Sequence, residues 1–324
     1  MSASGPVARL LRLARSRWVR AGFLVLCLVI AGAALAAEWQ DAVAAVRRLG
    51  PVPLVVGLVL SAGNVLLAGM SWRGALADLG SPLPLRPAAR VFLIGQLGKY
   101  VPGSVLQVVA QAELGRDYGV PRRRTASALA VQLILSVTSA LLLVLVAAPF
   151  ASGEAARRFG WAVLLAPLLL VLLHPRVLNP SLNAVLKRVG RQPLEHRTSL
   201  SGTARAGGWA VASWLSAGGQ VALLAIALGA PATARTVALA VGGYCLAWAI
   251  GFFVVIAPAG AGAREAALAA VMSPVLDPGG LVVLVLLSRL LLTVADLALA
   301  ALAVTLADRR LGQAAPGSGA DVSG

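Results

Sequence analysis

Residues 88–115 read AARVFLIGQLGKYVPGSVLQVVAQAELG, an apolar stretch interrupted at its centre by Tyr100-Val101-Pro102-Gly103-Ser104. A second apolar stretch, 237–274, is interrupted in the same way at Pro258-Ala259-Gly260-Ala261-Gly262. Proline removes a backbone donor and clashes with the preceding turn, and glycine frees the backbone. We therefore predict that each stretch forms two helical legs joined by a break. The residues that shape the two breaks are Pro102, Gly103, Pro258, Gly260 and Gly262.

The chain as a whole is apolar enough to lie in a bilayer. Of its 324 residues 59% are hydrophobic and 12% are charged, and this charged fraction is about half that of an ordinary soluble domain. Several of its uninterrupted apolar runs reach the length of about 20 residues that crosses a hydrocarbon core. The runs are 21–37, 52–72, 126–150, 161–175, 209–230 and 281–307. We predict an all-α integral membrane protein with about six transmembrane helices and two re-entrant hairpins.

The distribution of positive charge predicts the topology, because basic residues collect on the cytoplasmic side. If both broken stretches are re-entrant hairpins and the N-terminus is inside, 20 of the 28 basic residues lie inside, 5 outside and 3 within the membrane. The C-terminus and the loop 176–208 are then cytoplasmic as well. If both stretches cross fully, that loop faces outside; the leg 237–257 is long enough to span alone, so this alternative stays open.

The two breaks also indicate an internal repeat. Gly95 lies seven residues before Pro102, and Gly251 lies seven before Pro258. Each half reads as span, span, broken hairpin and span. Three crossings per half is an odd number, so the second half has the opposite orientation in the membrane. Inverted repeats with broken helices in matching positions are typical of secondary transporters, whose sites lie at the breaks. We place one transmembrane domain at 21–310, with halves of about 21–150 and 161–307.

The two ends of the chain differ from this domain. Residues 1–20 hold five arginines and are predicted to be a basic cytoplasmic N-terminus, whereas 311–324 are predicted to be a disordered tail. The run 21–37 could be a cleaved signal peptide, since Ala34-Leu35-Ala36 resembles a cleavage site. We favour a retained signal-anchor because the rest of the chain is also membrane.

Charged residues inside apolar segments are costly and usually functional. Lys99, Tyr100 and Glu113 surround the first break, and Arg264 and Glu265 follow the second. A glycine-rich turn that opens a helix leaves amides unpaired, and a neighbouring arginine adds a bidentate donor for phosphate. In each group the charges could instead be interfacial or locally paired.

A third group lies on the last helix. Arg289, Thr293 and Asp296 are spaced i, i+4 and i+7, so they share one helix face. Asp296 could neutralise Arg289 or Lys99, and a purely structural ion pair is an alternative. We predict that Lys99, Tyr100, Arg264 and Arg289 bind a lipid phosphate, while Glu113, Glu265 and Asp296 balance the charge or hold a basic headgroup.

The composition argues against several function classes. Two cysteines and two histidines, none in a motif, predict no metal site and no cofactor. We find no P-loop, dinucleotide fingerprint or nucleophile elbow, so no catalytic residues and no enzyme activity are predicted. The net charge of +16 is explained by cytoplasmic loops and anionic headgroups, not by nucleic acid.

Two of these motifs carry a family resemblance. The run Gly98-Lys99-Tyr100-Val101-Pro102-Gly103 resembles the GKYxPG signature of the lysylphosphatidylglycerol synthase transmembrane region, a flippase-like family. The run from Pro258 to Ala266 is similar to its PGGxGxREA signature, although Ala259 stands where the family often has glycine. Arg289 and Asp296 resemble its closing Arg…Asp pair. The resemblance covers roughly residues 15–310.

The resemblance implies a flippase-like membrane protein of the cytoplasmic membrane that binds and translocates a phospholipid or other anionic lipid. The bifunctional synthases add a soluble domain that transfers an aminoacyl group from tRNA. This chain ends soon after its last helix, so we expect it to lack that activity. The alternative is a non-catalytic accessory protein that holds a lipid carrier for a glycosyltransferase or other cell-envelope synthesis partner.

The topology can be tested by labelling introduced cysteines from outside intact cells. We expect labelling at positions within 151–160 and none within 176–208, because only the second segment carries the cytoplasmic excess of basic residues. External labelling within 176–208 would contradict the topology.

Overall fold

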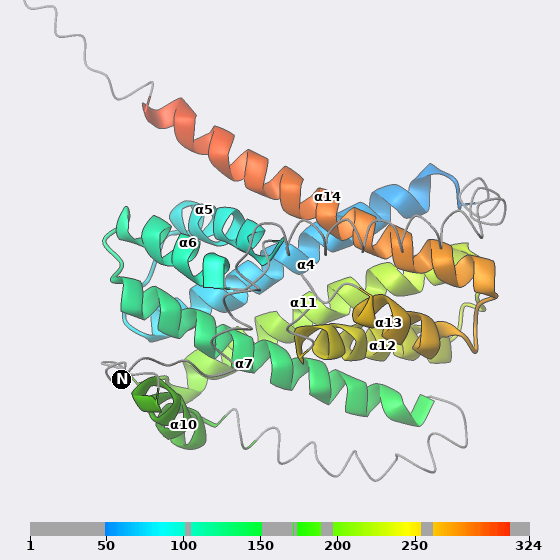
Figure 1. Ribbon diagram of the computed structural model, residues 1–324, viewed down its shortest axis with the longest axis horizontal. Coiled ribbons are helices and arrows are strands. Elements are labelled where there is room, and N and C mark those ends of the chain that lie inside the picture. The colour runs from blue at the N-terminus through cyan, green and yellow to red at the C-terminus, as the bar shows by residue number, and fades with distance from the viewer. Residues whose placement is uncertain are drawn as a thin grey trace, which may run out of the picture.

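Two long helices, α4 (Pro51–Asp78) and α11 (Leu200–Ala227), run antiparallel along each other through the centre of the computed structural model (Figure 1). The Asn64 side-chain amide donates to the Ser213 carbonyl oxygen at 2.9 Å, and Ser213 Oγ donates back to the Asn64 carbonyl oxygen at 2.9 Å. Hydroxyl and amide side chains bond across helices in an apolar medium, where water offers no competing partner. This helix pair is the framework on which the other helices pack.

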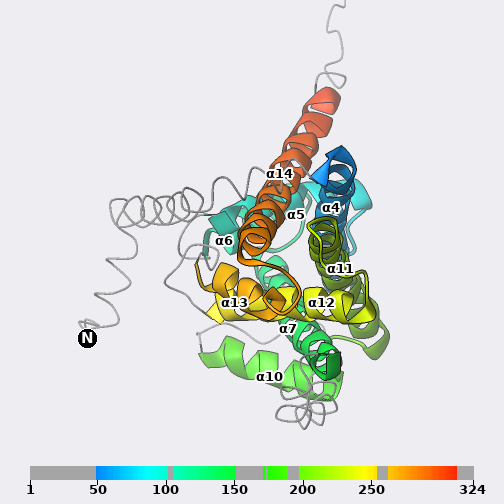
Figure 2. The same cartoon turned by 90° about the vertical axis from the view of Figure 1, so that its right-hand side faces the viewer.

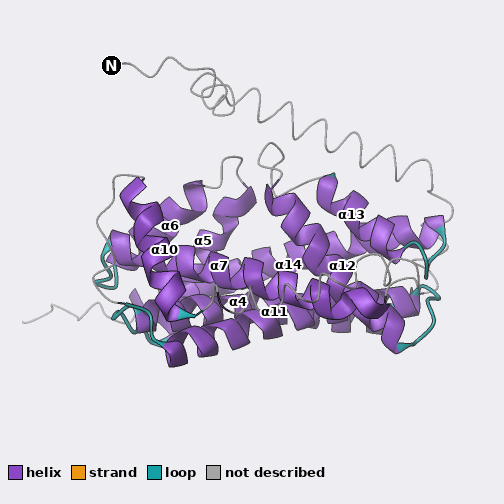
Figure 3. Ribbon diagram, turned by 90° about the horizontal axis from the view of Figure 1, so that it is seen from below, coloured by secondary structure: helices purple, strands orange, loops and turns teal. Residues whose placement is uncertain are grey.

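The structure describes residues 49–100, 105–150, 171, 174–188, 197–253 and 262–311, and every regular element in these ranges is a helix (Figure 3). Five of the described helices are long and apolar enough to cross a bilayer. They are α4, α7 (Arg122–Ala147), α11, α12 (Ala234–Phe253) and α14 (Pro278–Leu311). The prediction of an all-α, multi-pass membrane protein is confirmed.

Four of the five coincide with predicted spans: α4 with 52–72, α7 with 126–150, α11 with 209–230 and α14 with 281–307. The fifth, α12, is the first leg of the broken stretch 237–274. The predicted span 21–37 and most of 161–175 lie outside the described residues, as do 1–20 and 312–324. The prediction of about six transmembrane helices is therefore tested only in part.

Each broken stretch folds as two helices packed against each other. In the first, α5 (Leu85–Gln96) continues into the short 3-10 helix η1 (Leu97–Tyr100) and pairs with α6 (Val105–Arg116). Gly95 faces Gln111, so the two legs are antiparallel. Each leg has 12 residues and measures about 18 Å, which is too short to cross a bilayer core of about 30 Å.

In the second stretch, α12 pairs with α13 (Ala263–Met272), as Figure 2 shows. A Cβ at Gly243 of α12 would lie 2.8 Å from the Val271 side chain of α13. The predicted break residues Pro102, Gly103, Pro258 and Gly260 lie outside the described residues. Gly262 is described, and it immediately precedes α13. Re-entry of either hairpin from the side where it began remains a prediction.

The two hairpins enter the bundle from opposite ends. Helix α5 begins shortly after α4 ends, and α12 begins shortly after α11 ends. Because α4 and α11 are antiparallel, the α5–α6 pair and the α12–α13 pair lie at opposite ends of the molecule (Figure 1). Helix α14 packs against α5 and α7 packs against α12. The last helix of each half therefore packs on the hairpin of the other half.

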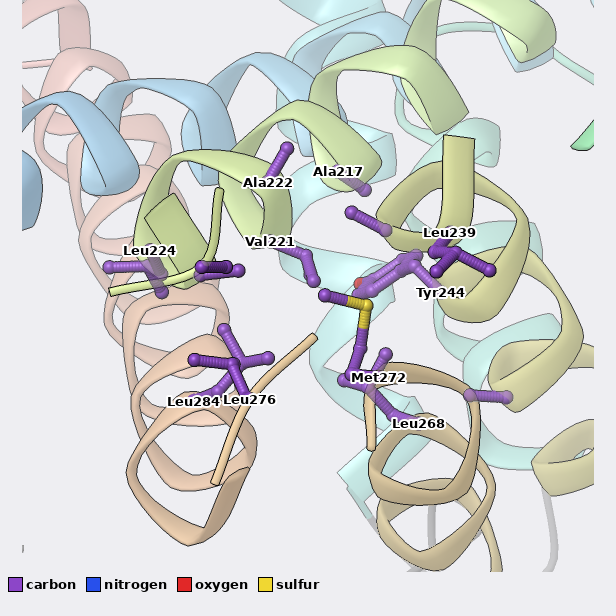
Figure 4. Packing of buried hydrophobic residues seen from close by; sticks show 14 of the residues in the cluster. Ala217, Val221, Ala222, Leu224, Leu239, Tyr244, Leu268, Met272, Leu276 and Leu284 are labelled. Atoms are coloured by element: carbon purple, nitrogen blue, oxygen red, sulfur yellow. The ribbon is translucent and has the colours of Figure 1, made fainter. Parts of the chain in front are cut away.

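Apolar side chains fill two clusters, one around each hairpin. The first includes Trp72 and Leu76, both fully buried, with side chains from α5 and α7. In the second, Met272 and Leu268 of α13 point toward Val221 of α11 (Figure 4). Burial against protein on one side and an exposed apolar surface on the other is expected of helices that face lipid.

The hydrophilic segment 176–208 is not only a loop as predicted. It contains α10 (Pro175–Arg188), and α11 begins at Leu200, before the apolar run at 209. Ser199 caps α11 by accepting the Gly202 N–H at 3.0 Å, and this cap supports the earlier start. Both features lie outside the apolar runs, so the length of an apolar run did not predict them.

The packing of α11 on α12 can be tested at two adjacent glycines. A Cβ at Gly218 would lie 2.5 Å from Val241 Cα, whereas a Cβ at Gly219 would have no neighbour within 4 Å. We expect Gly218→Ala to destabilise the protein by about 1–3 kcal/mol, because overpacking forces two backbones apart. Thermal denaturation in detergent measures the effect, with Gly219→Ala as the matched control. Equal melting temperatures for the two variants would contradict this packing.

Candidate functional site

An ion pair joins the tip of the first hairpin to α14. Lys99, in η1, places its Nζ 2.7 Å from Asp296 Oδ2. The Asp296 side chain has no exposed surface, and the Lys99 side chain is 26% exposed. Removing two charges from water is costly even when they pair. Such a pair in an apolar bundle therefore marks a candidate functional site.

A second ion pair joins α14 to the start of α13. Arg289, two helical turns before Asp296 on α14, pairs with Glu265. The other oxygen of Glu265 accepts the N–H of Gly262 at 2.6 Å. Gly262 has a φ of 86°, which side-chain-bearing residues rarely adopt. Glu265 thus holds the turn that opens α13 and the Arg289 side chain together.

Arg264 has a different kind of partner. Its Cζ lies 4.7 Å from the centre of the Tyr244 ring, a cation–π contact. It is also near enough to Lys99 for the two cations to repel each other. Among the described residues no carboxylate forms an ion pair with Arg264. Its positive charge is therefore held beside a ring, without an acidic counter-ion there.

The structure thus brings the two broken stretches together. Lys99 comes from the first stretch, Arg264 and Glu265 come from the second, and α14 supplies Asp296 and Arg289. The sequence left two partners open for Asp296, and the structure selects Lys99. Thr293, on the same helix, donates to the Arg289 carbonyl oxygen at 2.9 Å. Tyr100 ends η1, and its side chain is not among those described.

Glu113 does not join this site, although it was grouped with the first break. It is exposed near the end of α6, 2.7 Å from Arg122 and 3.3 Å from Arg116. The hydrogen bond from Arg122, more than the one from Arg116, holds the pKa of Glu113 below its usual value. Helix α6 runs away from the break, and Glu113 lies about two turns after the first residue of α6, so its side chain is distant from the break.

Two further buried side chains lie near the breaks. Tyr244, which holds Arg264, is 20 residues distant in sequence, so no local spacing points to it. Gln111 is fully buried against Gly95, and neither its amide nitrogen nor its oxygen has a hydrogen-bond partner among the described side chains and backbone. Its polarity within an apolar leg was the available signal.

Comparison with known protein families identifies the membrane domain to which the chain is similar. A family model described as the lysylphosphatidylglycerol synthase TM region matches residues 7–300, which is most of the chain and includes every residue of the site. No curated protein matches the chain.

The Lys99–Asp296 pair can be tested by removing one charge at constant shape. We expect Asp296→Asn to destabilise the protein by roughly 2–4 kcal/mol, because Lys99 then stays in an apolar site without its counter-ion. The control is Glu113→Gln, an exposed carboxylate whose loss should change the melting temperature little. Thermal denaturation in detergent compares the two. Similar melting temperatures for both variants would show that the buried pair contributes nothing special.

Proposed function

We propose, because the chain belongs to the lysylphosphatidylglycerol synthase TM region family, that it binds an anionic lipid and moves this lipid between the leaflets of the cytoplasmic membrane. The members of this family are membrane domains associated with lipid-related functions. The observation that carries the proposal is that α14 forms ion pairs with both broken stretches, through Asp296 with Lys99 and through Arg289 with Glu265, the neighbour of Arg264. Like charges in an apolar interior repel and are costly to desolvate. A lipid phosphate placed between Lys99 and Arg264 relieves both costs.

The side chains suit a phosphate oxygen. Arg264 offers a planar set of N–H donors that can bind phosphate in a bidentate manner. Lys99 offers a compact ammonium group that can hydrogen-bond a third oxygen. The first turn of α13 adds the positive end of a helix dipole, although Glu265 already accepts the Gly262 N–H. Arg264 and Lys99 are therefore the primary ligands in this proposal.

Asp296 and Glu265 act as counter-ions in this scheme. When no lipid is bound, Asp296 neutralises Lys99 and Glu265 neutralises Arg289. A lipid phosphate competes with Asp296 for Lys99, so that binding loosens the hold of α14 on the first hairpin tip. This competition gives lipid binding a direct effect on how the two inverted hairpins are held.

The proposed orientation follows the basic residues. The α5–α6 end of the bundle is also where α4 ends and where α7 and α11 begin (Figure 1). The basic residues in or next to these helix ends and in α5 and α6 are Arg73, Arg86, Arg90, Arg116, Arg122, Arg123, Arg124, Arg197 and Arg205, whereas Arg235 is in the first turn of α12, which begins at the opposite end. We place the α5–α6 end in the cytoplasm. The chain is proposed to be non-enzymatic, and any transport to be facilitated or ion-coupled, since its sequence contains no P-loop.

Arg264 tests this function. We expect Arg264→Gln to slow lipid scrambling by purified protein in liposomes by about tenfold or more, the loss of one charge-assisted contact. Arg264→Lys should slow it less, because the charge stays but the planar fork is lost. The matched control is Arg235→Gln, an exposed arginine in the first turn of α12, at the opposite end of that helix from the break.

Thermal denaturation of each variant separates function from folding. Normal scrambling by both Arg264 variants, or loss of their fold, would contradict the phosphate site. Retained lipid binding by the wild type without any scrambling would favour the accessory role, in which the protein holds a lipid for an envelope-synthesis partner.

A further inference from the structure

The charges at the junction of the two breaks do not balance. Among the described residues, the ionisable side chains gathered there are Lys99, Asp296, Arg289, Glu265 and Arg264. Asp296 pairs with Lys99, and Glu265 pairs with Arg289. Arg264 contacts the Tyr244 ring, which carries no compensating charge. When all five are ionised, these described side chains together carry one positive charge in excess.

The neighbouring segments leave this balance unchanged. Residues 101–104 and 254–261, which complete the two breaks in the sequence, read VPGS and VVIAPAGA and contain no ionisable side chain. The next acidic residue in α6 is Glu113, which is occupied by Arg116 and Arg122 at the surface. The excess therefore belongs to Arg264, the only cation of the five described junction residues that has no acidic partner among them.

A single excess charge distinguishes between two kinds of lipid phosphate. A phosphodiester carries one negative charge, so it neutralises the junction. A phosphomonoester carries about 1.5 to 2 negative charges near neutral pH, so its second charge is left uncompensated. An uncompensated charge is strongly disfavoured where the surroundings are apolar and the effective dielectric constant is low.

Resting on the proposed lipid-binding function, we infer that the junction selects lipids whose phosphate is a monoanionic diester and discriminates against lipids that end in a phosphomonoester. Arg264 is the residue that sets this preference, because it supplies the excess charge. Carrier lipids with a terminal phosphate belong to the disfavoured class.

The test compares two lipids that differ by one methyl group. Phosphatidylmethanol and phosphatidic acid with identical acyl chains, one a diester and the other a monoester, are incorporated in trace amounts as fluorescent analogues into liposomes containing the purified full chain. Near neutral pH we expect the diester to be bound and scrambled about tenfold better. Lowering the pH to about 5 protonates the monoester, whose second pKa is about 6, so the two lipids should then behave alike.

Changing the charge of the junction gives a second readout. Glu265→Gln keeps an acceptor for the Gly262 N–H but raises the net charge of the junction by one. The ratio of diester to monoester scrambling should therefore fall toward one or reverse. Arg264→Gln lowers the net charge by one, so it should weaken binding of both lipids and weaken the monoester more than the diester, whereas Arg235→Gln should leave the ratio unchanged. Because the pH arm uses the unmodified protein, it remains decisive if a variant fails to fold.

The outcomes separate this inference from the function on which it rests. Equal handling of the two lipids near neutral pH, or a preference unaffected by lowering the pH, overturns the charge inference and leaves lipid transport standing. Failure of the wild type to bind or scramble either lipid overturns both. A preference for the monoester near neutral pH would show that the excess charge is larger than the junction residues provide.

Discussion

The Lys99–Asp296 ion pair is the interaction on which the candidate site depends. It fastens the tip of a short helical hairpin to the middle of α14 and does so with a carboxylate that has no exposed surface. An apolar interior provides no water to replace either partner, so the two groups must stay together or be exchanged for other charged groups. Arg289 and Glu265 repeat this arrangement two turns away on the same helix. Helix α14 therefore holds both broken stretches through charge.

The framework that brings these charges together is a packing result. The antiparallel α4–α11 pair sets the two hairpins at opposite ends of the bundle, and α14 packs against both α5 and α13. Close approach of helices requires small residues where backbones meet, as at Gly218 against Val241. The last helix of each half packs on the hairpin of the other half, α14 on α5 and α7 on α12, so the two halves interlock.

These two features together define what the site can do. Cations from both halves lie beside α14, and the two carboxylates that pair with cations there come from two helices, Asp296 from α14 and Glu265 from α13. A bound anion that competes for Lys99 would alter the attachment of the first hairpin, whereas Arg264 would receive the anion without breaking an existing ion pair. In the proposed function Arg264 receives the anion without exchanging an ion pair and Lys99 exchanges Asp296 for the anion, which would link occupancy to hairpin position.

The sequence by itself determined the membrane class, the long helices α4, α7, α11 and α14, the positions of both breaks, and the family. These follow from local properties, because the length of an apolar run and the presence of proline and glycine act within a few residues. The sequence also identified Lys99, Arg264, Glu265, Arg289 and Asp296 as unusual charges. Only the tertiary structure decided that Asp296 pairs with Lys99, that Tyr244 holds Arg264, and that Glu113 lies with surface arginines. Helical periodicity assigns a residue to a face, but the partner on that face depends on which other helix lies there, and that is decided by packing between segments far apart in the chain.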